Sequence, residues 1–315
     1  MRYFIVWLYL AWCNAADAGA QRIAKVWQVR RMLACLLLRH FHYRVLFRLA
    51  RVIYRLPFID PHLKARACVA TANKRSLLAH DETLDYVGFT LRRKVLELGV
   101  MWGQNRQALA ELAACRQQLD EVVAPLHESG TPVILAPLHM VSDVLVAMVG
   151  AGVTPGKTTV IVSSRADEYQ QQTRALGGID LDYCSIHDDN REIAGNLMSA
   201  VMEAAENRRN IMIYPDITPD FTVNASHDST AKLPCRLFER PANLHSGILR
   251  VARMLGAQVV FYHLYHDGKL KLHIEPPVPA RKLKTLLPEI IEKAIRQHPD
   301  DWMLWHAHSL YFINE

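Results

Sequence analysis

The chain has 315 residues, half of them hydrophobic and 22% of them charged, which excludes an intrinsically disordered protein and allows one large domain or two smaller ones. The net charge of +6 is unevenly distributed. Residues 1–66 contain twelve basic and two acidic side chains, so residues 67–315 carry a net charge of −4. We therefore expect two parts, a basic apolar N-terminal region over residues 1–66 and a larger domain over residues 67–315, with an anionic partner for the first.

The longest uncharged run, residues 3–16, is shorter than the roughly 20 apolar residues that cross a bilayer. Because Arg2 precedes this run, a cleaved signal peptide is one interpretation. Trp7 and Trp12 favour a membrane interface instead.

Residues 22–56 mix apolar runs with arginines, and Arg44, Arg48, Arg51 and Arg55 follow helical spacing. This pattern predicts an amphipathic helix that lies on an anionic lipid surface. Nucleic acid is the other anionic candidate, but no nucleic-acid-binding motif accompanies the charge, so we expect no nucleic-acid partner.

Residues 68–128 have a helical pattern, and beyond them short apolar runs alternate with helical segments. We expect strands at residues 131–135, 158–162, 210–214, 257–265 and 269–275, and helices at residues 143–151, 190–206, 246–255 and 283–297. Asp267 and Gly268 predict a hairpin turn between the last two strands. The alternation predicts an α/β sandwich whose mainly parallel sheet is flanked by helices.

His139 lies where the first strand gives way to a helix, which is the usual place of an active site in such folds. Asp143 follows four positions later, so the two side chains would share a helix face. A carboxylate bonded to one imidazole nitrogen leaves the other free to remove a proton from a hydroxyl or amine. We therefore predict His139 as a general base oriented by Asp143, although a buried histidine beside a capping aspartate explains the same spacing.

Polar residues also follow the next two strands, where they would reach the same sheet edge. Ser164 and Arg165 follow the second strand and are candidates for binding substrate, Arg165 through a phosphate group. Asp216 follows the third strand and is a candidate for ordering a loop or orienting a polar headgroup.

The sequence patterns of metal sites, serine hydrolases, nucleotide-binding proteins and CxxC motifs are not found. The histidine pairs His263/His266 and His306/His308 have no evident third ligand, so we expect no metal. No serine-hydrolase elbow, P-loop or dinucleotide-binding glycine motif is present. The six cysteines contain no CxxC and are expected to be reduced thiols.

The order of several blocks resembles the bacterial lipid A late acyltransferase family, within the lysophospholipid acyltransferase superfamily. The blocks are Leu138-His139, Ser164-Arg165, Tyr214-Pro215-Asp216, and residues 237–242, 256–260 and 298–306. The chain is similar to a divergent member, because three residues separate His139 from Asp143 (HxxxD) where the family has four (HxxxxD/E) and where Val144 stands here.

The resemblance implies transfer of an acyl group to a hydroxyl of lipid A or a lysolipid, at the cytoplasmic face of the inner membrane. It implies His139 as the base, Asp143 as its partner and Arg165 as a phosphate contact. It also implies an acyl carrier protein as partner, with the donor held as a phosphopantetheine or CoA thioester and no further cofactor.

Two alternatives stay open. The first is that the chain resembles a branch of this family that transfers an aminoacyl group, glycine, from a carrier protein to lipid A. A non-catalytic lipid-binding protein on the same fold is the third interpretation, and it would gain support if Asp143 pointed away from His139.

Overall fold

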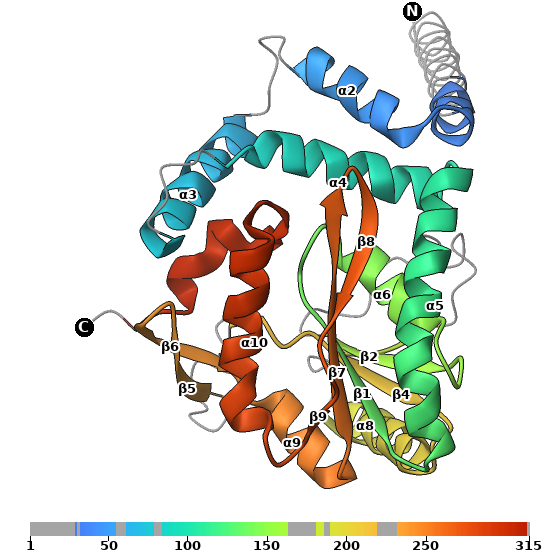
Figure 1. Ribbon diagram of the computed structural model, residues 1–315, viewed down its shortest axis with the longest axis vertical. Helices are drawn as coiled ribbons and strands as arrows, with labels where there is room; N and C mark the ends of the chain where they lie inside the picture. The colour runs from blue at the N-terminus through green and yellow to red at the C-terminus, as the bar shows by residue number, and fades with distance from the viewer. Residues whose placement is uncertain are drawn as a thin grey trace, which may run out of the picture.

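A mostly parallel β-sheet with helices on both faces forms the centre of the computed structural model (Figure 1). The structure describes residue 29 and residues 32–54, 61–78, 84–162, 181–185, 190–218 and 232–313. This architecture confirms the predicted α/β class with a mainly parallel sheet.

The main sheet has the strand order β3-β2-β4-β1-β7-β8, and β9 pairs with β7. Its strands are β1 (Val133–Pro137), β2 (Thr158–Val162), β3 (Leu181–Ser185), β4 (Asn210–Ile213), β7 (Gln258–Asp267), β8 (Lys269–Ile274) and β9 (Val278–Pro279). All strands from β3 to β7 in this order are parallel, while β8 and β9 run antiparallel to β7. A separate hairpin consists of β5 (Lys232–Leu237) and β6 (Arg240–His245).

The helices surround this sheet. They are α2 (Tyr43–Tyr54), α3 (Pro61–Leu78), α4 (Tyr86–Met101), α5 (Arg106–Glu128), α6 (Asp143–Ala151), α8 (Asn190–Ala205), α9 (Gly247–Leu255) and α10 (Leu283–Gln297). The chain then continues through the short 3-10 helices η4 (Pro299–Asp301) and η5 (Met303–Leu310). We call residues 299–312 the C-terminal tail.

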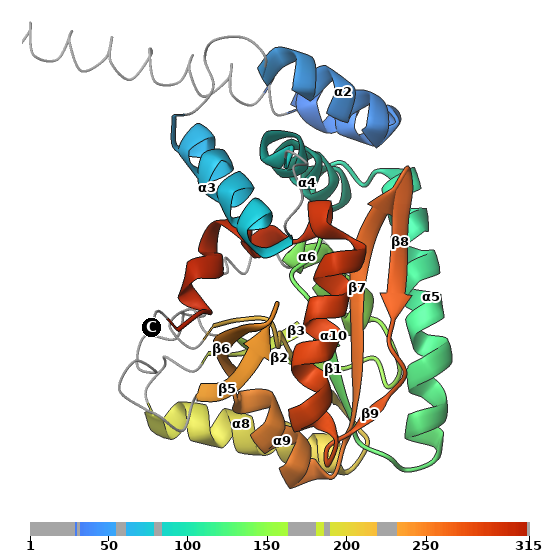
Figure 2. The same ribbon diagram turned by 60° about the vertical axis from the view of Figure 1, so that its left-hand side comes forward.

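The strands are apolar on both faces because both faces are covered. In β1, Val133 and Leu135 pack with α5 and α6, whereas Ile134 and Ala136 pack with α8, α9 and α10. Figure 2 shows α5 and α10 on opposite sides of the sheet. Successive residues of a strand point to opposite faces, and here both faces are buried. The sequence therefore shows continuous apolar runs at these strands and no alternation of polar and apolar residues.

The predicted elements after residue 128 agree with the structure within two residues at each end. The structure adds β3, β9, the β5–β6 hairpin and the 3-10 helices η4 and η5, which were not predicted. In the N-terminal region, residues 32–40 and α2 form two helices with a break at Phe41 and His42, where one helix was expected. Residues 3–16 and Arg55 lie outside the described residues.

The carboxyl ends of β1 and β4 lie side by side because these two strands are parallel neighbours. Figures 1 and 2 both show α3 and α4 at the end of the sheet toward which β7 points. The expected boundary between residues 66 and 67 falls inside α3, which packs against η5. None of the helices in the described ranges combines the length and apolarity needed to cross a bilayer.

Gly150 allows α6 to approach the sheet closely. A Cβ atom at this position would lie 2.1 Å from the hydroxyl oxygen of Tyr262 and 2.6 Å from Cε of Met212. We expect Gly150→Ala to lower the free energy of unfolding by about 1–3 kcal/mol, because a methyl group would be forced into a filled space. Urea unfolding monitored by circular dichroism measures this change.

Gly99→Ala in α4 is the matched control. Its Cβ would lie 3.6 Å from Cβ of Asn105, an ordinary contact, and alanine favours a helix over glycine by up to about 1 kcal/mol. Equal unfolding free energies for the two variants would contradict the close approach of α6 to the sheet.

Candidate active site

His139 and Asp216 meet at the edge of the sheet where β1 and β4 end. His139 follows β1 by two residues, and Asp216 follows β4 by three. The backbone N–H of His139 donates to Oδ2 of Asp216 at 2.9 Å. A second bond, 2.8 Å long, joins Nδ1 of the imidazole to Oδ1 of the same carboxylate.

This geometry sets the tautomer of the imidazole. The carboxylate accepts, so Nδ1 carries the proton and Nε2 has the free lone pair. Nε2 makes no hydrogen bond to any residue that the structure describes. The side chain of His139 is 12% exposed and that of Asp216 is 1% exposed, so the carboxylate lies deeper in the protein than the base.

The predicted contact between His139 and Asp143 is wrong in this structure. Helix α6 begins at Asp143 and is capped by Ser142, whose hydroxyl accepts the N–H of Leu145. His139 therefore lies before the helix, and the rule that positions i and i+4 share a helix face does not apply to it. The Asp143 carboxylate binds Arg93 of α4 instead, with 2.9 Å between Oδ1 and Nη2.

The prediction for Asp216 had two parts, ordering a loop or orienting a headgroup. Its carboxylate accepts the backbone N–H and the ring N–H of His139, so it does order the loop between β1 and α6. Because the carboxylate is buried, it is not placed to contact a headgroup. Ser164 and Arg165, the other two predicted binding residues, lie outside the described residues. Their predicted contacts stay predictions.

The loop between β1 and α6 has an unusual backbone. Val141 has a φ of 62°, a value that is costly for a β-branched residue, and the N–H of Ser142 bonds to the carbonyl of Met140 around it. The C-terminal tail holds this conformation, because the N–H of Val141 donates to the carbonyl of Asp301 at 2.8 Å. Backbone strain that the surroundings maintain is common at active sites.

The tail also contacts both members of the pair. The N–H of Met303 donates to the carbonyl of His139, and the indole N–H of Trp302 donates to Oδ2 of Asp216 at 3.2 Å. The hydroxyl of Tyr311 donates to the backbone carbonyl of Asp216 at 2.6 Å. Nothing in the local sequence pattern placed these tail residues next to β4, so sequence reasoning missed them as site residues.

Arg93 and Tyr214 complete the surroundings of the imidazole. Arg93 bonds to Glu97 as well as to Asp143, and Glu97 also accepts the hydroxyl of Ser142. The ring of Tyr214 lies 4.4 Å from that of His139, centre to centre, and its hydroxyl donates to the carbonyl of Asp143. The base is thus enclosed by one aromatic ring and a network of paired charges.

Burial of the imidazole lowers the pKa of His139, but two carboxylates outweigh this effect. Asp216 raises the pKa through its charge and its hydrogen bond, Asp143 raises it further through charge, and Arg93 lowers it. The net result is a pKa above the ordinary value for histidine. Asp143 therefore influences the base electrostatically without touching it.

The remaining histidines form no evident metal centre. Burial and neighbouring positive charges lower the pKa of His263 to about 3, so its ring is neutral, and it packs against His273 and His298. No cluster of three potential ligands occurs among the residues that the structure describes.

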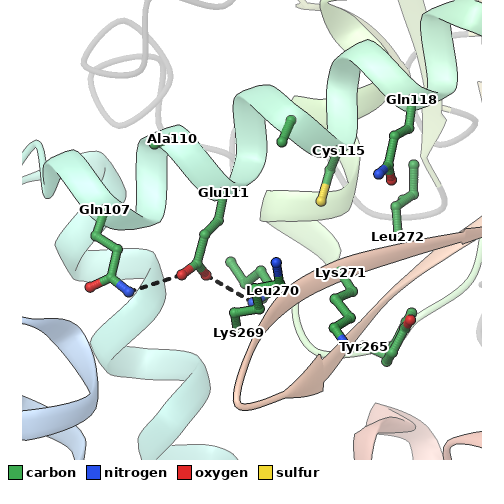
Figure 3. Close-up of a pocket in the computed structure, with 11 residues that line it drawn as sticks. Gln107, Ala110, Glu111, Cys115, Gln118, Tyr265, Lys269, Leu270, Lys271 and Leu272 are labelled. Atoms are coloured by element: carbon green, nitrogen blue, oxygen red, sulfur yellow. Dashed lines mark hydrogen bonds between the residues drawn. The ribbon is translucent and has the colours of Figure 1, made fainter.

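A separate groove lies between α5 and the β7–β8 hairpin (Figure 3), with a volume of about 480 Å³. Glu111 in this groove accepts the N–H of Leu270 on the edge strand and the hydroxyl of Tyr43 on α2, each at 2.8 Å. Glu111 thus ties α2 to the open edge of the sheet. His139 and Asp216 are not among the residues that line the groove.

No model of a protein family matches this chain, and no curated protein matches it.

Asp216→Asn should reduce stability more at low pH than at high pH. Because the pKa of His139 is raised in the folded protein, the ion pair with Asp216 stabilises the fold below the unfolded pKa of histidine, and this stabilisation is lost as the pH rises through the folded pKa. Urea unfolding of the natural protein and the variant at pH 5.5 and at pH 9 measures the difference. A loss that is independent of pH would mean that the pair is not ionised in the folded state.

Proposed function

We propose that the protein is an acyltransferase, which moves an acyl group from a carrier-protein or CoA thioester to a hydroxyl of a membrane lipid. Lipid A or a lysolipid is the acceptor that the sequence resemblance favours. The observation that carries the proposal is the His139–Asp216 pair, in which the hydrogen bond to Asp216 fixes the tautomer and leaves the lone pair of Nε2 unused by any described residue.

The reaction needs a base and no nucleophile from the protein. Nε2 of His139 accepts the proton of the lipid hydroxyl while the hydroxyl oxygen attacks the thioester carbonyl. The tetrahedral intermediate then expels the thiolate, which takes the proton back from Nε2, so that an ester and a free thiol are formed. The donor supplies its own activated thioester, and the proposal requires no metal or other cofactor.

Asp216 has the role that the sequence suggested for Asp143. Its bond to Nδ1 orients the ring, and its charge stabilises the imidazolium that forms during the reaction. Asp143 bonds to Arg93 and not to His139, which is the outcome that supports the non-catalytic interpretation, but Asp216 gives the imidazole another carboxylate partner. Asp143 remains close enough to act through its charge.

The N-terminal helices support a position on an anionic membrane surface. Val45, Leu49 and Val52 form an exposed apolar stripe on α2, opposite the side on which Tyr43 is buried. Arg48 and Arg51 are exposed on one side of this stripe, and Arg51 pairs with Asp85. The helix at residues 32–40 exposes Met32, Leu33, Leu36 and Leu37. These faces fit helices that lie at a lipid interface, and the resemblance implies the cytoplasmic side of the inner membrane.

One observation favours an aminoacyl donor as the second candidate. The Asp143 carboxylate lies near His139 and its side chain is 30% exposed, so it can pair with the ammonium group of a glycyl thioester. Such a group is absent from a fatty acyl chain. The lipid product distinguishes the two donors by its mass.

His139→Ala should abolish lipid modification. Loss of a general base lowers the rate by about 10²–10⁴-fold, because the hydroxyl is then left without a proton acceptor. Lipid extracts of cells that produce the natural protein or the variant are compared by mass spectrometry, with equal protein levels checked on blots. Full modification with the variant would refute the mechanism.

Two asparagine variants test which carboxylate serves the base. Asp216→Asn should reduce the modified lipid about as strongly as loss of His139, whereas Asp143→Asn should reduce it less than about tenfold. The reverse order would identify Asp143 as the partner during turnover, despite its bond to Arg93.

Leu49→Asp should weaken binding to vesicles that contain anionic lipid. The leucine is 52% exposed in the apolar stripe, and a carboxylate there opposes both burial in lipid and attraction to anionic headgroups. We expect a roughly tenfold lower partition coefficient in a vesicle sedimentation assay.

Met198→Asp on α8 is the matched control, since this methionine is 55% exposed but lies on another helix. It should bind vesicles like the natural protein. If the two variants lose binding equally, or neither does, α2 is not the lipid-binding face.

A further inference from the structure

The C-terminal tail is tied to the catalytic pair through Trp302, far along the chain from both residues. Trp302 and Asp216 are 86 positions apart, and Trp302 is 4% exposed. Its backbone bridges Met140 in the loop that carries His139. The tail therefore contacts the base and its carboxylate at once.

The carboxylate of Asp216 divides its hydrogen bonds between its two oxygens. Among the described residues, only Nδ1 of His139 donates to Oδ1, at 2.8 Å. Oδ2 accepts the backbone N–H of His139 at 2.9 Å and the indole N–H of Trp302 at 3.2 Å. Each donor at Oδ2 stabilises the negative charge, so less of that charge remains to stabilise an imidazolium at Oδ1.

The indole has little freedom to turn away from this contact. Trp305 packs against it edge to face, with 4.8 Å between ring centres. Trp305 is itself fully buried and fixed by a bond from its indole N–H to the carbonyl of Pro299 at 2.7 Å. A fixed donor in a dry environment has a stronger electrostatic effect than one in water.

We propose that Trp302 is a positioning residue that weakens His139 as a base, by donating its indole hydrogen bond to Asp216 and holding that carboxylate in place. This role rests on the proposed function in one respect, because the proposed reaction is what uses His139 as a base. The contact itself is a property of the folded protein. Trp302 does not touch the reacting atoms and acts through Asp216.

Other charged groups also face His139, and they do not involve Trp302. They are Asp143 at the start of α6 and Arg93 on α4, while Tyr214 supplies a neutral ring. Tyr311 donates to the backbone carbonyl of Asp216 and not to its carboxylate. Loss of the indole N–H alone therefore increases the negative charge that Asp216 presents to the imidazole, which makes the imidazole easier to protonate.

The test replaces Trp302 by 3-benzothienylalanine, which has sulfur in place of the N–H and nearly the same shape. In the full-length protein with isotope-labelled histidine, NMR titration gives the pKa of His139, assigned by its loss in His139→Gln. We expect this pKa to rise. At a pH below that pKa, the activity of the variant, expressed as a fraction of its own high-pH plateau, should be roughly twofold to fivefold lower than that of the natural protein. The reason is that a smaller fraction of His139 is unprotonated in the variant.

The same replacement at Trp305 is the matched control, since it removes a buried indole hydrogen bond to Pro299 and none to Asp216. The pKa of His139 should not change in this variant. An unchanged or lower pKa in the Trp302 variant would overturn the inference. An equal rise in both variants would also overturn it, because the cause would then be tail packing and not the donor.

The readout separates this inference from the proposed function. If the natural protein modifies no lipid but the titration shows the expected rise, the proposed reaction fails while the role of Trp302 stands. If lipid is modified and the titration shows no rise, the reaction stands and the role of Trp302 fails.

Discussion

The burial of the Asp216 charge is the constraint on which the site depends. A carboxylate that is 1% exposed must be satisfied by hydrogen bonds, since an unpaired buried charge is very costly. In the part of the chain that the structure describes, three donors meet this need, two from His139 and one from Trp302. Because these residues come from the end of β1, the end of β4 and the C-terminal tail, the same bonds that satisfy the charge also join the segments of the site.

This constraint explains the strained loop before α6. The positive φ of Val141 directs the chain so that His139 faces Asp216 while Asp143 begins the helix. The tail compensates for the strain by accepting the N–H of Val141. Asp143 does not contact the imidazole and pairs with Arg93. The carboxylates of Asp143 and Asp216 are therefore both near the base, but only Asp216 is in contact with it.

The N-terminal helices place a lipid-compatible surface at the same end of the molecule as the site. Both α3 and α4 lie at the end of the sheet toward which β7 points, and α2 packs on α4. Glu111 fixes α2 to the edge strand as well. The exposed apolar stripe on α2 therefore has a defined orientation relative to the carboxyl edge of the sheet, which the proposed acylation of a membrane-lipid hydroxyl requires.

The sequence by itself determined the alternation of strands and helices, because buried parallel strands and amphipathic helices have distinct apolar periods. It also placed His139 at the end of a strand. It gave no signal for β3, where Asp182 and Ser185 interrupt the apolar pattern, nor for the β5–β6 hairpin, whose turn residues Phe238 and Glu239 adopt positive φ without glycine or asparagine. Tertiary structure alone decided the partner of His139. Local spacing favoured Asp143, but the parallel pairing of β1 with β4 brings Asp216, 77 residues away, to the imidazole, and the tail closes around both.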